Sequence, residues 1–247
     1  MISPILEKLC EGQDLSEEEI ELIFSSMMKG ELSDIQSSSF LTALKIKKPS
    51  ADEIFFASNV LLKNLDDVPN HSMELLDLCG TGGDSKSTLN VSTISSLLLA
   101  SLGIKIAKHG NRSVSSKVGS ADLIEKLGLS MDVDLNESLS SIENTNFSFL
   151  FAPNFHKSMK NVSHVRKDLK MRTIFNILGP LVNPLRPKSQ IMGVYDIELV
   201  PIMAKVLQKQ GVKNALVVHG FDGMLSLIHI SEPTRRYAIS YAVFCLK

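Results

Sequence analysis

A glycine cluster directly after a short apolar stretch constrains the fold of this chain most. Leu75 to Cys79 predict a buried strand, and Gly80, Gly82 and Gly83 let the backbone turn tightly and approach a ligand. Hydroxyl and amide residues follow. After them, apolar residues recur at helical spacing, which predicts a helix; these residues are Val91, Ile94, Leu97, Leu98 and Leu102. A strand, a glycine turn and a helix N-terminus in this order predict an anion site, and the residue types favour phosphate.

The glycine cluster differs from the two common nucleotide-binding loops at one position. Both G-x-x-x-x-G-K-[ST] and G-x-G-x-x-G require glycine where Ser85 stands. The alternative is a turn whose glycines serve only to permit positive φ.

A second donor-rich segment favours ligand binding over that alternative. It runs from Lys108 to Lys117 and follows the next predicted strand, Gly103 to Ala107. The segment contains three cations, a glycine, an amide and three hydroxyls. Open α/β sheets place ligands at the ends of strands, although a solvated basic loop would have a similar composition.

Hydrophobic periodicity divides the chain into two domains. Residues 1–70 predict a small all-helical domain, in which Asp14 or Ser16 begins a helix that ends at Gly30. From Leu75 onward, short apolar strands alternate with amphipathic helices, which predicts an α/β domain with a mainly parallel sheet over residues 71–224. The further elements expected there are strands at 147–151, 191–195 and 215–218 and helices at 120–127, 157–170 and 200–210. Ser120 is expected as a helix N-cap, with Leu123, Ile124 and Leu127 facing inward.

Composition excludes several classes of function. The net charge of −1 provides no field that would recruit nucleic acid or an anionic membrane surface. Three scattered cysteines, Cys10, Cys79 and Cys245, predict neither a disulfide framework nor a thiolate zinc site. The N-terminus shows no signal-like apolar core, and no segment is long enough to span a membrane. We therefore expect a cytoplasmic enzyme that captures its anion locally.

Five motifs occur in the order typical of one family. They are Gly80-Thr81-Gly82-Gly83-Asp84, Asn90-Val91-Ser92-Thr93, Lys108-His109-Gly110-Asn111-Arg112-Ser113, Gly119-Ser120-Ala121-Asp122, and Arg172-Thr173-Ile174-Phe175-Asn176 through Asn183-Pro184. In this the chain resembles anthranilate phosphoribosyltransferase from Met1 to about Met224. The resemblance implies a helical domain plus an α/β domain and a homodimer joined through the helical parts. It also implies transfer of phosphoribosyl from 5-phosphoribosyl-1-pyrophosphate to the amine of anthranilate in tryptophan biosynthesis.

The same resemblance implies a set of site residues. The phosphoribosyl pyrophosphate site would contain Gly80, Gly83, Asp84, Thr88, Asn90, Val91, Ser92, Thr93, Lys108, His109, Gly110, Asn111, Arg112, Ser113, Val114, Ser115, Ser116 and Ser120. Gly80, Asn111 and Arg166 would contact anthranilate, with Arg166 pairing its carboxylate. Ser92 would touch a Mg²⁺ ion. Lys108 would act as the catalytic residue, because breaking the C1–pyrophosphate bond places negative charge on the leaving group.

The chain departs from the family pattern after Met224. Leu225-Ser226 stand where members carry an aspartate-glutamate pair that binds magnesium. Residues 225–247 resemble nothing in the family and look like translated non-native sequence joined to a truncated gene, so we expect the chain as written to be inactive. A true family variant is the alternative.

Two other functions are compatible with the residues. The first is a nucleoside phosphorylase of the related fold, which the match of Asn111 and Arg166 to the anthranilate pattern disfavours. The second is a non-catalytic protein that holds polyanions such as nucleic acid, which would require a basic groove and salt-sensitive binding.

Overall fold

The computed structural model describes residues 2–65, 68–82, 90–112 and 119–220. Contacts group the chain into two compact units, a helical unit (Met1–Leu65 and His156–Val182) and a sheet unit (Asp66–Phe155 and Asn183–Lys247). The sequence placed residues 156–182 in the α/β domain. Their contacts place them with the helices instead, so the helical unit is built from two separate stretches of chain.

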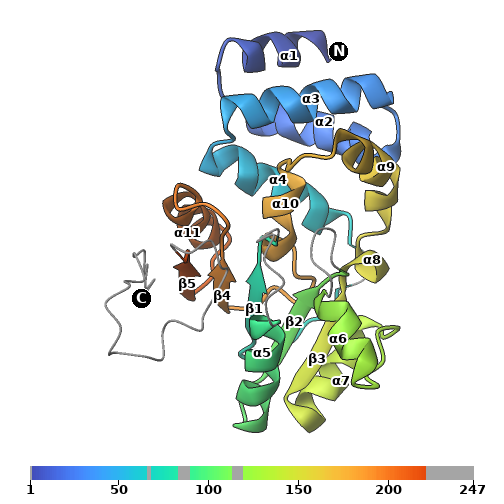
Figure 1. The fold of residues 1–247 in the computed structure, drawn as a ribbon, viewed down its shortest axis with the longest axis vertical. Helices are drawn as coiled ribbons and strands as arrows, with labels where there is room; N and C mark the ends of the chain where they lie inside the picture. Colours follow the sequence, from blue (N-terminus) through green and yellow to red (C-terminus); the bar gives the residue numbers. More distant parts are fainter. Residues whose placement is uncertain (1, 66–67, 83–89, 113–118, 221–247) are drawn as a thin grey trace. The chain divides into compact units, whose positions relative to one another are not determined.

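The helical unit begins with four helices, α1 (Ser3–Cys10), α2 (Glu17–Lys29), α3 (Asp34–Lys47) and α4 (Ala51–Lys63) (Figure 1). Its second stretch adds the 3₁₀ turn η1 (Lys157–Met159), α9 (Lys160–Leu169), α10 (Phe175–Leu178) and the 3₁₀ turn η2 (Gly179–Leu181). Helix α9 packs against α2 and α3, and α10 packs against α4. The predicted helical domain is confirmed in its elements.

Serine caps define where the first helices begin. Ser16 starts α2 as predicted, with a reciprocal capping box to Glu19. Ser33 starts α3 in the same way, with a reciprocal capping box to Gln36. The cap satisfies backbone N–H groups that the apolar pattern alone does not reveal.

Within its described residues, the sheet unit contains five parallel strands, β1 (Leu76–Gly80), β2 (Ile106–Gly110), β3 (Phe147–Phe151), β4 (Ser189–Gly193) and β5 (Asn214–Val218), in the order β3-β2-β1-β4-β5. Its helices are α5 (Val91–Ser101), α6 (Ser120–Lys126), α7 (Leu135–Thr145), α8 (Ala152–Phe155) and α11 (Leu199–Lys209). The strand order reverses beside β1, and open sheets bind ligands at such a point. The predicted α/β domain with a parallel sheet is confirmed.

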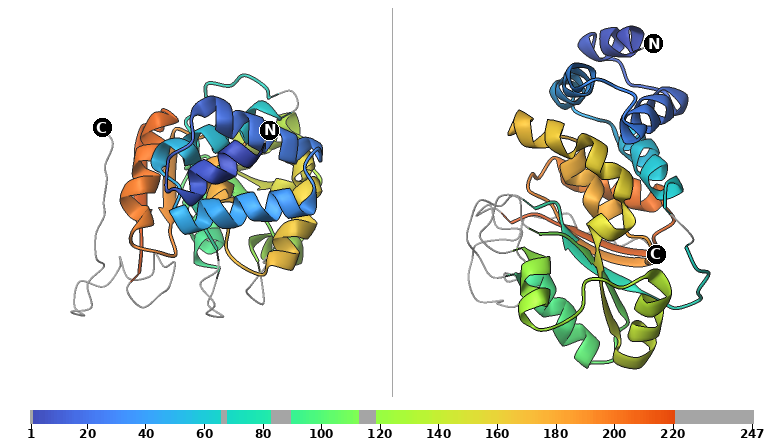
Figure 2. Two further views of the ribbon diagram at one scale, coloured as in Figure 1. Left: turned by 90° about the horizontal axis from the view of Figure 1, so that it is seen from above. Right: turned by 90° about the vertical axis from the view of Figure 1, so that its right-hand side faces the viewer.

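Helices cover both faces of the sheet. Figure 2 shows α5 and α6 on one face and α7 on the other. Leu78, Ile106 and Phe149 pack on the α5 and α6 side, with Ala100 and Ile124. A second cluster on the α7 side contains Leu75, Ala107, Ile142, Leu150 and Leu185. Successive strand residues therefore point to opposite faces, as the pleat requires.

Four sequence predictions in this unit need correction. Strand β2 begins at Ile106, three residues later than the predicted Gly103, and β4 begins at Ser189 rather than Ile191. Helix α6 has Gly119, not Ser120, at its N-cap position, and Leu127 is 53% exposed rather than inward.

Helix α5 forms where predicted but presents a different face to the sheet. Ile94, Leu98 and Leu102 are 47%, 61% and 71% exposed, whereas Thr93, Ser96 and Ala100 are buried. Small residues on the inward face let the helix lie close to the strands. Their hydroxyls can bond within the helix, as Ser96 Oγ does to Ser92 O at 2.6 Å.

Among the residues that the structure describes, no helix has both the length and the apolar character to cross a membrane.

Candidate functional site

Lys108 lies on strand β2 and not in the loop after it. Its side chain is 1% exposed, and Nζ donates to Leu78 O at 2.5 Å and to Ser92 Oγ at 3.2 Å. Ile106 and Lys108 share a strand face, so the ammonium points to the side of the sheet that α5 covers. The predicted catalytic lysine and the predicted metal-contacting serine are thereby in direct contact at the first turn of α5.

A buried carboxylate lies on the opposite face of the sheet from Lys108. Asp77 is 0% exposed; its Oδ1 accepts a hydrogen bond from His109 N at 3.3 Å, and its Oδ2 accepts one from Asn183 Nδ2 at 3.0 Å. Asn183 also donates to Ala107 O at 2.8 Å and accepts from Leu185 N at 3.0 Å. The amide therefore fixes the carboxylate to the end of β2.

These side chains replace part of the backbone ladder between β1 and β2. The two strands pair at Leu76 with Ile106, whereas each of the other three strand pairs is aligned over five residue pairs. Beyond Leu76, Leu78 O accepts from Lys108 Nζ and His109 N donates to Asp77. Buried backbone groups need hydrogen-bond partners. At the strand ends that carry the predicted site, the Lys108 ammonium and the Asp77 carboxylate provide them.

Burial shifts the pKa of each ionisable group in this network. Desolvation raises the pKa of Asp77 to about 6, against the opposing effect of Lys108 and of hydrogen bonds with Asn183, His109 and Cys79. The pKa of Lys108 is lowered by burial, which the charge of Asp77 partly offsets. The pKa of the Cys79 thiol is raised well above its ordinary value by burial and by Asp77, while Gln190 donates to Sγ at 3.0 Å. The two opposite charges thus stabilise each other's ionised form.

Hydrogen bonds join the start of α5 to the residues that follow β2. Asn90 Nδ2 donates to Gly119 O at 3.0 Å, and Ser120 Oγ donates to Asn111 O at 3.1 Å. Gly110 is closely surrounded: a Cβ there would lie 2.6 Å from Ser120 Oγ and 2.7 Å from the Phe149 ring. Glycine is required at this position because no side chain fits.

Arg112 is engaged by carboxylates of α6. Its Nη1 donates to Asp122 Oδ1 at 2.8 Å and to Glu125 Oε2 at 2.9 Å, and its guanidinium carbon lies 6.0 Å from the centroid of the Phe151 ring. These contacts compete with the predicted role of Arg112 in the phosphate wall.

The described members of the predicted phosphate site all lie in the sheet unit, and hydrogen bonds join Lys108 to Ser92 and Ser120 to Asn111. They are Gly80, Asn90, Val91, Ser92, Thr93, Lys108, His109, Gly110, Asn111, Arg112 and Ser120. Gly82 adopts φ +69°, as expected for the turn after β1. Gly83, Asp84, Thr88, Ser113, Val114, Ser115, Ser116 and the tail at 225–247 lie outside the described residues. Within the described ranges, no cluster of three or more histidine, cysteine, aspartate or glutamate residues could hold a metal ion.

Arg166 lies in the last turn of α9, in the helical unit. Its guanidinium carbon is 5.2 Å from the centroid of the Phe175 ring, and burial lowers its pKa. No ion pair of Arg166 occurs among the described residues. A partly buried guanidinium of this kind offers its donors to a carboxylate ligand.

Sequence reasoning assigned no role to Asp77, Asn183 or Phe175. A signal for Asp77 was available, because a single aspartate within an apolar strand requires buried partners. Its partner, Asn183, is 106 residues further along the chain and could not be paired with it from spacing.

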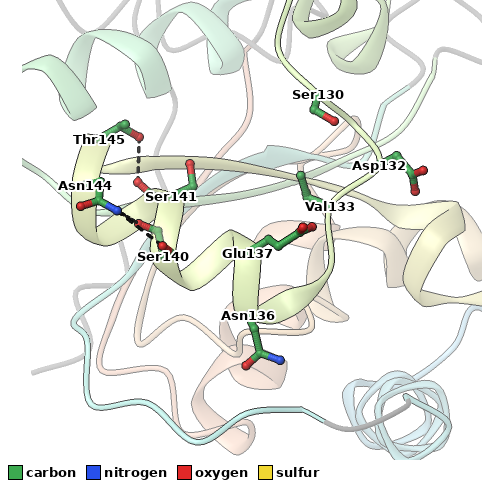
Figure 3. Close-up of a pocket in the computed structure, with 9 residues that line it drawn as sticks. All are labelled: Ser130, Asp132, Val133, Asn136, Glu137, Ser140, Ser141, Asn144 and Thr145. Carbon is green, nitrogen blue, oxygen red and sulfur yellow. Dashed lines mark hydrogen bonds between the residues drawn. The ribbon is translucent and has the colours of Figure 1, made fainter.

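A separate depression of about 740 Å³ lies along α7 (Figure 3). It is lined by Ser130, Asp132, Val133, Asn136, Glu137, Ser140, Ser141, Asn144 and Thr145. None of the predicted site residues is among them.

Two sequence families match the two parts of the chain. Residues 3–64 match the helical bundle domain of the glycosyl transferase family, and residues 72–235 match its a/b domain. The fold and the site thus define a two-domain glycosyl transferase. The chain is 45% identical to an anthranilate phosphoribosyltransferase of Persephonella marina over 225 residues, which is 91% of this chain and 66% of that relative.

Solved structures agree with this relationship. Anthranilate phosphoribosyltransferase from Thermus thermophilus superposes with a TM-score of 0.84 at 38% identity, covering 90% of this chain and 67% of that one. The Saccharomyces cerevisiae enzyme in complex with PRPP and Mg gives a TM-score of 0.81 at 34% identity, covering 90% and 66%. The chain belongs to the anthranilate phosphoribosyltransferase family. It spans just under two thirds of the length of the Persephonella marina relative.

Proposed function

We propose that the protein transfers phosphoribosyl from 5-phosphoribosyl-1-pyrophosphate to anthranilate, giving N-(5-phosphoribosyl)anthranilate and pyrophosphate. The observation that carries the proposal is the buried ammonium of Lys108, held against Ser92 at the first turn of α5. A fixed cation and a helix N-terminus together provide a phosphate-binding environment. The identity of the two substrates is inferred from the relatives, which are anthranilate phosphoribosyltransferases.

The reaction places demands that these residues can meet. The C1–oxygen bond of the ribose breaks and its electron pair leaves with pyrophosphate, while the amine nitrogen of anthranilate forms the new bond to C1 and loses a proton. Lys108 would stabilise the charge that develops on the leaving group, in a buried position where electrostatic interactions are strong. An aryl amine is unprotonated at neutral pH, so no strong base is needed to activate it.

Magnesium fits this site through a hydroxyl oxygen and the substrate. Ser92 Oγ is a hard oxygen ligand of the kind that Mg²⁺ accepts, and Mg²⁺ commonly takes its remaining ligands from phosphate and water. When bound, the ion would neutralise pyrophosphate charge. Lys108, beside Ser92, would hold the same phosphate group from the protein side.

We assign Arg166 to the carboxylate of anthranilate, with Gly80 and Asn111 as further contacts to this substrate. The support for Arg166 is its partly buried guanidinium, whose carbon lies 5.2 Å from the centroid of the Phe175 ring and which has no ion pair among the described residues. Gly80, at the end of β1, has no side chain that would obstruct a substrate.

Further parts of the proposal concern assembly, location and the tail. We propose a homodimer joined through the helical unit and a cytoplasmic location. That residues 225–247 are foreign to the family, and that the chain as written is inactive, stay predictions; the match to the a/b domain extends to residue 235 and so includes the first part of this segment.

The proposal is tested by isothermal calorimetry with each substrate, which measures binding and does not require turnover by the chain as written. Arg166→Ala should weaken anthranilate binding by about 1.5–3 kcal/mol, the contribution of a charge-assisted hydrogen bond, and leave phosphoribosyl pyrophosphate binding unchanged. Lys167→Ala, which removes a neighbouring exposed cation, is the matched control and should change neither. Equal losses for both substrates in Arg166→Ala would contradict the assignment.

A further inference from the structure

A column of aromatic rings leads from the core of the helical unit to Arg166. Phe40 meets Phe24 edge-on, with centroids 5.8 Å apart and planes at 87°. Phe24 meets Phe175 at 5.7 Å and 60°, and the Phe175 ring lies 5.2 Å from the guanidinium carbon of Arg166. Phe24 and Phe40 are both 0% exposed and Phe175 is 5% exposed, so Phe175 is supported by the core from behind.

This arrangement limits how Arg166 can be oriented. An arginine side chain normally samples many rotamers, and fixing it costs conformational entropy. An aromatic face attracts a guanidinium, and the attraction is stronger where water is excluded. The guanidinium carbon lies over the Phe175 ring, and the N–H donors of a guanidinium all lie in its own plane. In-plane donors match a planar carboxylate in a bidentate manner.

We propose that Phe175 is a positioning residue that sets the plane of Arg166 and thereby the preference of the site for a carboxylate over a neutral group. This inference rests on the proposed function, in which Arg166 pairs with the carboxylate of anthranilate. Phe175 acts through Arg166 and has no direct role in the chemistry. Phe24 in turn holds the Phe175 ring in place.

The test measures selectivity instead of overall affinity. The probes are anthranilate and 2-aminobenzamide, which has a similar shape but carries a neutral amide in place of the carboxylate. The ratio of their dissociation constants, measured by calorimetry, reports the carboxylate preference. Phe175→Leu keeps an apolar side chain but removes the ring face, and it should reduce the ratio about tenfold while the affinity for phosphoribosyl pyrophosphate stays unchanged.

Phe40→Leu is the matched control. It makes the same substitution two rings away from Arg166 and should lower thermal stability to a similar degree while leaving the ratio unchanged. Phe175→Met fills the space with a flexible side chain and should reduce the ratio of dissociation constants as Phe175→Leu does. This second variant answers the question if Phe175→Leu does not fold.

The outcomes separate the inference from the function on which it rests. A wild-type ratio that is retained in both Phe175 variants but lost in Arg166→Ala would overturn the positioning role and leave the proposed function intact. A reduced ratio in Phe40→Leu would also overturn it, because loss of core packing alone would then suffice. A wild-type protein that does not distinguish the two probes would overturn the role of Arg166 and, with it, this inference.

Discussion

Replacing Asp77 with asparagine should change how the stability of the protein depends on pH. The carboxyl group is fully buried and contacts Cys79, Asn183 and the backbone N–H of His109, on the sheet face opposite Lys108. Asparagine has almost the same shape but carries no charge at any pH. The substitution therefore separates the cost of burying this charge from the hydrogen bonds that the side chain makes.

The size of the effect follows from the raised pKa of Asp77. Burial raises this pKa from 3.8 to about 6. A shift of roughly two units corresponds to about 3 kcal/mol. Because the folded-state pKa is the higher one, the folded protein binds this proton more tightly than the unfolded chain does. The stabilising contribution is fully present below pH 4 and is lost as the pH rises through 6.

Asp77→Asn lacks this titration but gives up one hydrogen-bond acceptor. Either His109 N–H or the Asn183 amide would then face an NH₂ group, at a cost of about 1–3 kcal/mol at every pH. We expect the variant to be less stable than wild type at pH 4 by this amount. Between pH 4 and pH 8 the wild type should lose about 3 kcal/mol of unfolding free energy relative to the variant. At pH 8 the two proteins should therefore have similar free energies of unfolding.

Urea unfolding followed by far-UV circular dichroism at pH 4 to 8 measures these free energies. Asp132→Asn, which removes an exposed carboxylate from the same unit, is the control and should show no such shift. A stability difference between Asp77→Asn and wild type that stays constant over this pH range would refute the reasoning. It would mean that Asp77 titrates alike in the folded and unfolded states.

Two further substitutions test packing and charge burial. Gly110→Ala places a Cβ 2.6 Å from Ser120 Oγ and 2.7 Å from the Phe149 ring, and it should lower the free energy of unfolding by about 1–3 kcal/mol; no loss in urea unfolding would show that β2 shifts freely. Glu53→Ala should cost about 1–3 kcal/mol, because the buried Leu15 N–H loses its acceptor and Lys47, which is 4% exposed, keeps only its ion pair with Asp14. Replacing both Glu53 and Lys47 with apolar residues should recover the part of the loss that comes from the buried Lys47 charge, and a double variant no more stable than Glu53→Ala would contradict the argument.

The sequence alone determined the elements and the class of site. Local signals sufficed for this: alternating and helical periodicity, serine caps such as Ser16, and the glycines after β1, of which Gly82 adopts the positive φ that was expected. The motifs also located Lys108 and Ser92, which the structure places in contact. Such features depend on residues close together in the chain.

Tertiary structure decided what depends on contacts between distant segments. Ile94 and Leu98 are exposed because the sheet accepts the small face of α5, a choice that apolar periodicity cannot reveal. Residues 156–182 join the helical unit through packing with helices more than a hundred residues away. The burial of Asp77 also depends on tertiary structure. A buried carboxyl group needs hydrogen-bond partners, and one of them, Asn183, comes from a distant part of the chain.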